Sequence, residues 1–465
     1  MKRLRLFVYI LAILGLYACN KDKFLDKKPS SDMLIPKSLA DYQALLDNTN
    51  IMMFTGGLAE LSSDDYVVSD VNYMGVSDVV QRNAYVWSKD IYDGVVDIKD
   101  WNVIYKQVFY ANAVLEGLEK HTEANSPNGK YLKGWALFVR AHAFYDLVRS
   151  FCKPYDVASA NNDLGIPLRL KAGIDEILPR ATLQQSFERI FSDLANAEDL
   201  LPSSRPSLNL NRPSKIALYA LLARIYLDMR NYERAEFYAD KCLDLYSTLI
   251  DYKTISKTST TPFSTTNDEL IYNTSTIASY SQFVGTSVNS RGKVPAELIA
   301  LYEPNDLRLA VYFDKAADNT YTRKRGYIGA GTYPFTGLAT DEIHLIKAEC
   351  LARRDQIGSA MGKLNELLIK RWDANATTPA RPFINIVAHN SSEALSIVLQ
   401  ERRKELIWRC LRWQDLKRFN KEGSNITLSR RVNGQNYQLT PNDPRWVFPI
   451  PDDEILSSGI EQNIR

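Results

Sequence analysis

The side chains that most often perform catalysis are scarce in this chain and poorly spaced for it. The four histidines lie far apart and form no HExxH pair, so a zinc centre is not expected. No GxSxG turn is present for a nucleophilic serine. Gly329-Ala330-Gly331 runs into Thr-Tyr-Pro instead of a helix start, so it does not predict a phosphate-binding loop. We therefore expect no catalytic residues, no metal and no cofactor.

Acidic residues cluster at two places, Asp64-Asp65 and Asp452-Asp453-Glu454. Carboxylate oxygens are ligands for calcium, so either run could hold that ion. A solvated loop or the acidic first turn of a helix explains both runs better, because carboxylates favour helix N-termini. A glycosidase needs two carboxylates across a cleft, and the sequence leaves that alternative open.

Aromatic rings are plentiful, with 26 Tyr and 7 Trp in 465 residues. Such rings can hold sugars through the CH groups on one face of each sugar ring. They also suit the core of a helical protein, so composition leaves both interpretations open. The net charge is +2, and the first five residues supply +3 of it, which puts the rest of the chain near −1. Because no basic run stands out, we expect no nucleic-acid partner.

The first 19 residues have the pattern of a secretory signal. Basic residues precede an apolar run over 6–16, which is too short to span a membrane comfortably, and Ala18 then leads to Cys19. The pattern predicts a bacterial lipoprotein signal peptide over 1–18, cleaved so that Cys19 comes first and carries acyl chains. Residues 19–30 would then form a lipidated tether. The alternative is an uncleaved N-terminal anchor helix.

Cysteine is sparse beyond this signal. The four remaining cysteines are far apart and stand in apolar or helical contexts: Cys152, Cys242, Cys350 and Cys410. Four cysteines allow three pairings, but this spacing is not that of a disulfide framework in so long a chain. We expect small, buried thiols on helices.

Helical periodicity dominates the segments that must position any site. We expect a helical scaffold over four stretches: 38–50, 101–151, 182–245 and 341–420. Within 214–245, a large residue, a leucine, a small residue and a tyrosine follow one another as in the first helix of a tetratricopeptide pair, and small residues recur later as in its second helix. The segment 341–371 is a weaker copy of this pattern. We expect about four such pairs, one of which joins 182–201 to the helix that follows it. Thr182 is the predicted N-cap of that helix.

Two stretches lack helical period. We expect loops over 54–98, where 54–86 reads as an ordered loop, and over 250–340, which is rich in Ser, Thr, Asn, Tyr and Gly. Long irregular insertions in a helical scaffold commonly carry function. The predicted fold class is therefore mostly α, with a tetratricopeptide-like scaffold and a long irregular insertion that forms the ligand face.

The densest pattern lies in the last predicted helix, 392–420. One face carries an apolar stripe: Leu406, Cys410, Trp413 and Leu416. The opposite face is charged, with i,i+4 pairing options around Glu401 and Glu405. We interpret this helix as a structural ion-pair network plus a core stripe rather than a ligand site, because its charges are spread out and do not converge.

The chain resembles the SusD/RagB-like outer-membrane lipoproteins, the nutrient-binding partners of SusC-type TonB-dependent transporters. The resemblance covers nearly the whole chain and depends on the order of several short motifs. The motifs are Phe24-Leu25-Asp26, Trp101-Asn102, Arg140-Ala141, Glu349-Cys350-Leu351-Ala352, Glu401-Arg402, Glu405-Leu406, Arg412-Trp413, Pro449-Ile450-Pro451 and Gln462-Asn463.

The resemblance implies a single SusD-like domain over 31–465, with no catalytic activity. Its helical side would pack on the transporter, and its loops would hold an oligosaccharide or a peptide. The protein would close as a lid over the transporter, anchored to the outer membrane by its lipid and facing outside. Three alternatives stay open: a peptide-binding member of the same family, a lipoprotein glycosidase, and a tetratricopeptide-type scaffold of an envelope complex.

The resemblance places the ligand site in the loop after the first short helix and in the central insertion. The polar and aromatic residues there are the candidate ligand contacts: Asp65, Tyr66, Tyr73, Trp87, Tyr280, Tyr327 and Tyr333. Trp87 is the first choice among them. Each could instead be a buried side chain that anchors a loop.

Overall fold

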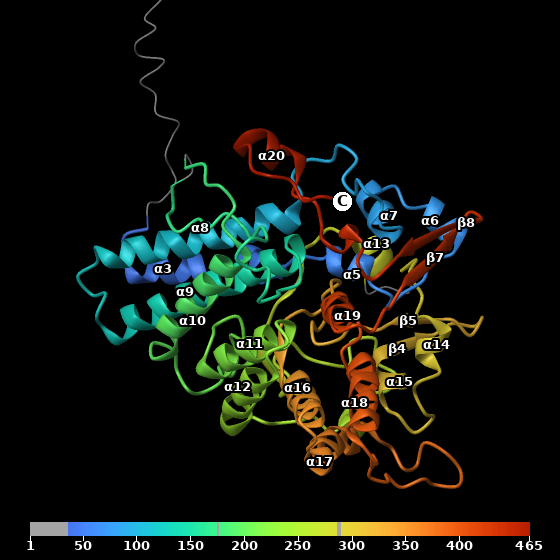
Figure 1. The fold of residues 1–465 in the computed structure, drawn as a ribbon. Helices are drawn as coiled ribbons and strands as arrows, with labels where there is room; N and C mark the ends of the chain where they lie inside the picture. Colours follow the sequence, from blue (N-terminus) through green and yellow to red (C-terminus); the bar gives the residue numbers. More distant parts are fainter. Residues whose placement is uncertain (1–35, 174–175, 286–289) are drawn as a thin grey trace, which may run out of the picture.

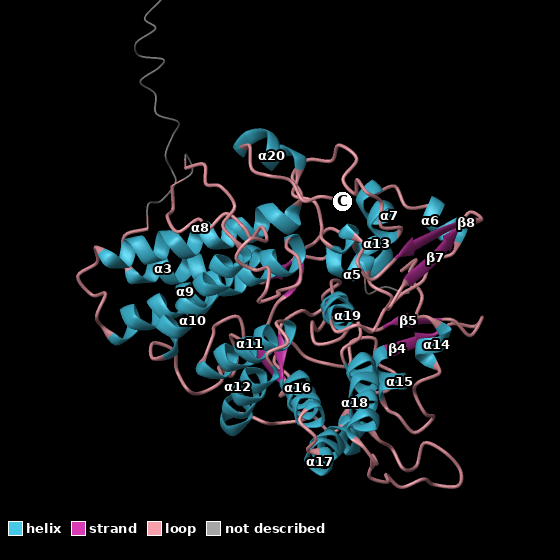
Figure 2. Cartoon of the chain, viewed as in Figure 1, coloured by secondary structure: helices cyan, strands magenta, loops and turns pink. Residues whose placement is uncertain are grey.

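The computed structural model describes residues 36–173, 176–285 and 290–465. The predicted signal peptide and lipidated tether, with Cys19, lie outside these described residues. The described chain is mostly helical, as predicted; the long helices over 99–245 lie together on one side, and the hairpins over 313–323 and 428–439 lie on the other (Figure 1, Figure 2). Among the described residues, no helix combines the length and the apolar character needed to cross a membrane.

Ten longer helices build the scaffold and the region that adjoins it. They are α3 (Leu39–Leu46), α8 (Lys99–Glu119), α9 (Pro127–Phe151), α10 (Leu183–Glu198), α11 (Lys215–Asp228), α12 (Tyr232–Leu245), α16 (Thr340–Arg353), α17 (Ile357–Leu368), α18 (Ser391–Glu405) and α19 (Arg412–Lys421). The predicted N-cap of α10 is confirmed, since the Thr182 hydroxyl accepts from the Gln185 backbone N–H at 3.1 Å and the Gln185 side chain accepts from the Thr182 backbone N–H at 3.0 Å. Such a reciprocal capping box satisfies two backbone donors at the helix start.

The remaining helices and the strands are short. The helices are α4 (Thr49–Met52), α5 (Leu58–Ser62), α6 (Asp70–Met74), α7 (Val79–Tyr85), α13 (Ser281–Val284), α14 (Ala296–Ile299), α15 (Arg308–Tyr312) and α20 (Asp452–Ser458), with single 3-10 turns at η2 (Tyr252–Thr254), η3 (Ile369–Arg371) and η4 (Pro444–Trp446). The strands are β1 (Phe54–Thr55), β2 (Leu270–Tyr272), β3 (Ser275–Thr276), β4 (Phe313–Lys315), β5 (Tyr321–Arg323), β6 (Leu338–Ala339), β7 (Leu428–Val432) and β8 (Gln435–Leu439). They pair in twos, β1 with β3 in parallel and β2–β6, β4–β5 and β7–β8 antiparallel.

The scaffold helices pack in succession along the chain. α8 packs on α9, α11 on α12, α12 on α16, and α16 on both α17 and α18. The tetratricopeptide-like pattern of 214–245 is confirmed in α11 and α12, where the small residues Ala235, Ala239 and Cys242 are fully buried. Small residues allow the helices to approach closely.

The structure corrects the expected pairing of 182–201 with the helix that follows it. α10 packs along the preceding helix α9 and touches α11 only slightly. A buried ion pair crosses the α9–α10 contact, in which the Arg140 Nε lies 2.7 Å from an Asp193 carboxylate oxygen. The apolar period of α10 shows that one face is buried, but it does not say against which neighbour.

The stretch 54–86 is not one ordered loop, because it contains α5, α6 and α7. The Ser69 and Asp78 side chains cap α6 and α7 by accepting backbone N–H donors. Helices of five to seven residues complete fewer than two turns, so they show no clear apolar period in the sequence.

The predicted helix over 392–420 is broken. α18 ends at Glu405 and α19 begins at Arg412, and between them Trp408 and Cys410 have φ values of 56° and 55°. The backbone N–H of Cys410 donates to the buried carboxylate of Glu60 at 2.9 Å. A left-handed conformation is unfavourable for these residue types, and contacts from a distant part of the chain hold it here. The predicted apolar stripe of this segment is buried, as expected.

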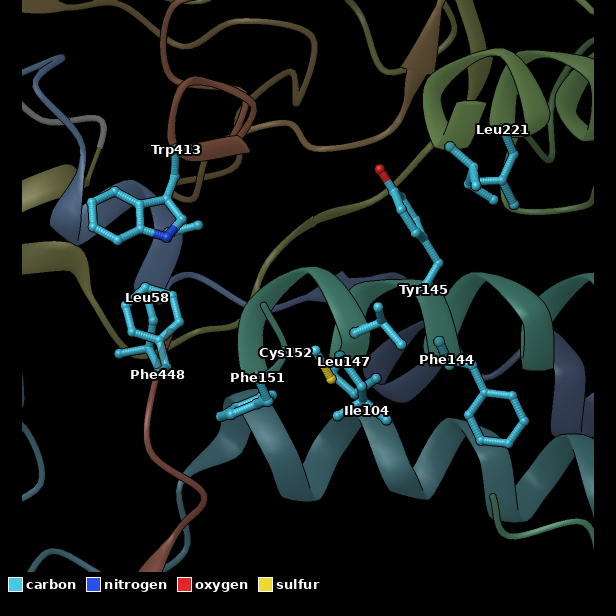
Figure 3. Packing of buried hydrophobic residues seen from close by; sticks show 14 of the residues in the cluster. Leu58, Ile104, Phe144, Tyr145, Leu147, Phe151, Cys152, Leu221, Trp413 and Phe448 are labelled. Atoms are coloured by element: carbon cyan, nitrogen blue, oxygen red, sulfur yellow. The ribbon is translucent and has the colours of Figure 1, made fainter. Parts of the chain in front are cut away.

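The largest buried cluster joins the scaffold to the loop side. Figure 3 shows Phe151 and Ile104 packed where α8 meets α9, and Trp413 of α19 beside Phe448 and Leu58. The Trp413 and Phe448 rings are stacked, with centroids 5.6 Å apart. The four cysteines beyond position 19 are free and buried, as predicted.

Candidate ligand-binding site

Two of the predicted contact residues, Tyr66 and Trp87, form a packed aromatic cluster. Each is only 2% exposed. The Arg430 guanidinium lies between them, 5.3 Å from the Tyr66 ring centroid and 4.6 Å from that of Trp87. The Trp87 Nε1–H donates to the Ser62 carbonyl at 2.9 Å, and the Tyr66 hydroxyl donates to the Leu61 carbonyl at 2.6 Å. These contacts give both rings a structural role, and their contact with a ligand stays a prediction.

Tyr280 and Asp65 are also buried. The Tyr280 hydroxyl donates to Asp100 at 2.6 Å, so this ring ties the insertion to α8. Asp65 lies near Glu60, and each carboxylate has one oxygen with no hydrogen-bond partner among the described residues. Burial, followed by the charge of Asp65, raises the pKa of Glu60 to about 8. Burial, followed by the charge of Asp64, raises the pKa of Asp65 to about 6.

Tyr327 belongs to a buried charge network. Its hydroxyl donates to Glu269, and the Arg409 guanidinium lies 4.5 Å from its ring centroid. Three carboxylates here offer oxygens within 4.8 Å of one another, a spacing that a metal could use: Glu269, Asp341 and Glu405.

Arginines already neutralise this carboxylate cluster. Arg371 bridges Glu269 and Glu405 at 2.8 and 2.7 Å, and Arg409 lies 2.6 Å from Asp341. In the part of the chain that the structure describes, none of these three carboxylates has a buried oxygen without a hydrogen-bond partner. We therefore regard the cluster as a structural network.

Only two of the predicted residues keep a partly exposed ring. Tyr73 packs on Tyr85 and Phe283 with centroid distances of 5.9 and 6.4 Å, and Tyr333 lies in the loop before β6. The structure places Tyr66, Tyr73 and Trp87 around one cluster and Tyr327 in another. The seven predicted residues therefore do not line a single cleft.

A cleft of about 520 Å³ opens instead beside the β4–β5 hairpin, within the predicted insertion. Tyr321 of β5 is half-buried and stands opposite Lys315 of β4 in the hairpin register. Phe313 supports the Tyr321 ring edge-on, with centroids 6.3 Å apart. Thr258 and Asp314 add polar atoms to the lining. We call this the β4–β5 cleft, and it combines a half-buried tyrosine ring with hydrogen-bonding groups.

The sequence did not single out Tyr321 as a contact residue. Its strand has three residues, too few to show alternation against the polar insertion around it. The available signal is the turn-forming pair Asp318-Asn319 between two short segments that carry aromatic residues, because such a pair is typical of a hairpin.

A larger cleft, of about 670 Å³, lies between residues 153–164 and the C-terminal segment 441–464. Its tryptophan, Trp446, is 4% exposed and donates its indole N–H to the Thr440 carbonyl at 2.7 Å. The Asn463 side-chain amide donates to two backbone carbonyls. The larger cleft therefore offers no open tryptophan face among the described residues, and the β4–β5 cleft is the better candidate for a sugar ligand.

The two acidic runs are engaged in ways that do not require calcium. Asp64 pairs with Arg412 at 2.7 Å and with Arg403 at 3.0 Å. Although burial raises the pKa of Asp64, the hydrogen bond and charge of Arg412 outweigh it and lower that pKa to about 2. The run 452–454 forms the first turn of α20, where Glu454 pairs with Arg169 at 3.3 Å.

Two family models together match almost the whole chain. One, described as starch-binding associating with outer membrane, matches residues 23–227, and the other, described as the SusD family, matches residues 245–464. The chain belongs to the SusD/RagB family. The β4–β5 hairpin lies entirely within the second match.

Relatives of known structure are distant in sequence but share the fold. A SusD superfamily protein from Bacteroides thetaiotaomicron is 18% identical, with a TM-score of 0.69 over 92% of this chain and 100% of that one. A SusD-like carbohydrate binding protein from Bacteroides vulgatus is also 18% identical, with a TM-score of 0.65 over 91% and 97% of the two chains. SusD-like protein P38 from Formosa agariphila is 28% identical over 200 residues, and the match spans 42% of this chain and about a third (34%) of that relative's length.

Proposed function

We propose that this SusD/RagB chain is a non-catalytic binding protein that captures an oligosaccharide in the β4–β5 cleft. The observation that carries the proposal is the half-buried Tyr321 ring, which lines a cleft with polar groups around it. A pyranose presents CH groups on one face and hydroxyls around its rim, so it needs this combination. The family membership and the carbohydrate-binding relative support the same assignment.

The proposal includes a place for the protein in the cell. A lipid on Cys19 would hold it at the outer membrane, facing outside, and its helical side would pack on a SusC-like TonB-dependent transporter. The protein would act as a lid that traps the ligand over the transporter. Family membership supports this arrangement.

A glycan and peptide array tests the ligand assignment. The chain is produced with Cys19→Ser so that it stays free of lipid, and Tyr321→Ala is compared with Phe237→Ala, which removes an exposed ring from α12 on the scaffold. We expect oligosaccharide binding that Tyr321→Ala reduces at least tenfold, consistent with loss of a binding hot spot, and that Phe237→Ala leaves unchanged. Binding of peptides alone would overturn the oligosaccharide assignment, and glycan cleavage would overturn the non-catalytic one.

Affinity purification from outer membranes tests the transporter assignment. The lipidated chain should be recovered with a β-barrel transporter, whereas the Cys19→Ser chain expressed in the same cells should be recovered with less. Recovery of the lipidated chain without any barrel protein would contradict the lid model.

A further inference from the structure

The acidic groups in and beside the β4–β5 cleft already have cationic partners. Asp306 lies 2.6 Å from Arg308, and Asp314 lies 3.7 Å from Lys324. Beside the cleft, Asp373 lies 2.5 Å from Lys257. A ligand entering here therefore meets carboxylates whose charge is largely compensated.

Lys315 is the exception to this pairing. Among the described residues its ammonium forms no ion pair or hydrogen bond, and it lies 5.9 Å from the Tyr321 ring centroid. The side chain of Lys315 is exposed. The two residues are directly opposite in an antiparallel hairpin, and the Lys315 ammonium lies over the Tyr321 ring, so a cation and an aromatic ring meet at the cleft.

A second ammonium, that of Lys324, lines the cleft, but it is the ion-pair partner of Asp314. Lys324 is buried and donates to the carbonyls of Lys257 and Ala310 at 2.6 and 2.8 Å. Its carboxylate neighbour Asp314 is 3.7 Å away and partly compensates its charge. Burial lowers the pKa of Lys324, so a negative charge nearby would stabilise its charged form.

We propose that the β4–β5 cleft selects acidic oligosaccharides, with the Lys315 ammonium binding the sugar's anionic group while the sugar ring stacks on Tyr321. This inference rests on the proposed function, since it names the ligand class for the same site. The anionic group is a carboxylate or a sulfate ester, because an ammonium recognises either as a point charge.

Titration calorimetry with paired probes tests this selectivity. The probes are uronate oligosaccharides and their methyl esters, and sulfated oligosaccharides and their desulfated forms. We expect the acidic member of one pair to bind the wild-type chain at least tenfold more tightly than its neutral counterpart. The preference should shrink at high ionic strength, because the Lys315 site is exposed. The pair that shows it identifies the anionic group as carboxylate or sulfate.

Three variants distinguish the effect of the Lys315 charge on binding from an effect on folding. Lys315→Gln should abolish the preference and leave binding of the neutral probe unchanged, whereas Lys315→Arg should retain the preference. Lys130→Gln, at an exposed lysine on α9 of the scaffold, should change neither. Circular dichroism should show that all three are folded.

The outcomes distinguish the two proposals. If neutral and acidic probes bind equally and Tyr321→Ala abolishes both, the charge selectivity is wrong and the oligosaccharide function stands. If Lys315→Gln leaves an acidic preference intact, the assignment of Lys315 is wrong. If no oligosaccharide of either kind binds, the proposed function itself fails.

Discussion

The hydroxyl of Tyr280 donates a 2.6 Å hydrogen bond to Asp100, a buried carboxylate in the first turn of α8. The other oxygen of Asp100 accepts the backbone N–H groups of Gly57 and Leu58 at 2.6 and 3.0 Å. One carboxylate thus fastens both irregular regions to the scaffold. A Cβ at Gly57 would lie 2.8 Å from the Tyr280 ring, so this close approach requires glycine.

Tyr280→Phe should destabilise the protein by about 1–3 kcal/mol, because it removes a hydrogen bond from a buried carboxylate. Denaturant unfolding measures the change. Tyr437→Phe removes an exposed hydroxyl contact from β8 and should change the unfolding free energy by less than about 0.5 kcal/mol. Equal stability of the Tyr280→Phe variant and the wild type would show that Asp100 does not depend on this contact.

Trp87→Ala should lower the free energy of unfolding by about 3–5 kcal/mol, the usual cost of removing a large buried aromatic ring. The indole is 2% exposed and its N–H bonds to Ser62. Ligand affinity per folded molecule should stay unchanged. A loss of about 2 kcal/mol of binding energy at native stability would instead support the sequence-based prediction of ligand contact.

Glu60→Gln should reduce the loss of stability that the wild type suffers as pH rises. Burial and the charge of Asp65 raise the pKa of Glu60 from 4.5 to about 8, so the folded state holds this proton more tightly than the unfolded state. The resulting stabilisation is complete below pH 4.5 and is lost as pH rises towards 8, at up to about 1.4 kcal/mol per pH unit.

Urea unfolding at pH 5 and pH 8 measures this effect. The amide oxygen of the introduced glutamine can still accept the Cys410 N–H, so the Glu60→Gln variant should gain stability relative to the wild type at pH 8. Glu119→Gln, at the exposed end of α8, is the control and should leave the pH profile unchanged. If the wild type and Glu60→Gln changed in unfolding free energy by the same amount between pH 5 and pH 8, the raised pKa of Glu60 would be contradicted.

Arg308→Met should destabilise the protein by about 3–5 kcal/mol, because it leaves buried carboxylates without their cation. Arg308 contacts three of them within 2.9 Å: Asp306, Glu401 and Glu405. Arg381→Met breaks an exposed pair with Glu303 and should cost less than about 1 kcal/mol. Thermal unfolding compares the stabilities of the two variants. If both lowered the unfolding temperature by a similar small amount, the buried ion-pair network around Arg308 would contribute little to stability.

Much of the helical scaffold can be predicted from the sequence, because apolar period and capping residues are local signals. Thr182 caps α10 as expected, and α11 and α12 follow the tetratricopeptide-like pattern. The break between α18 and α19 could not be predicted, since it depends on Glu60, which is 350 residues from Cys410 in the sequence. The charges around Glu401 and Glu405 form the expected ion-pair network, but they converge on Arg308 instead of spreading over one helix.

The site was harder to predict than the fold. Aromatic residues in irregular segments were expected to meet a ligand, but whether a ring is open depends on distant partners. Arg430, more than 300 residues later in the chain, covers Trp87, whereas Tyr321 stays partly open beside its own hairpin partner. Composition pointed to the insertion, which contains the proposed β4–β5 cleft, but it could not indicate which aromatic ring is partly exposed.

The most direct test of the ligand site is hydrogen–deuterium exchange of the Cys19→Ser chain with and without a saturating oligosaccharide taken from the array. We predict that the ligand slows exchange in the β4–β5 hairpin, residues 313–323. Slower exchange confined to residues 153–164 and 441–464, at the larger cleft, would contradict the placement of the site.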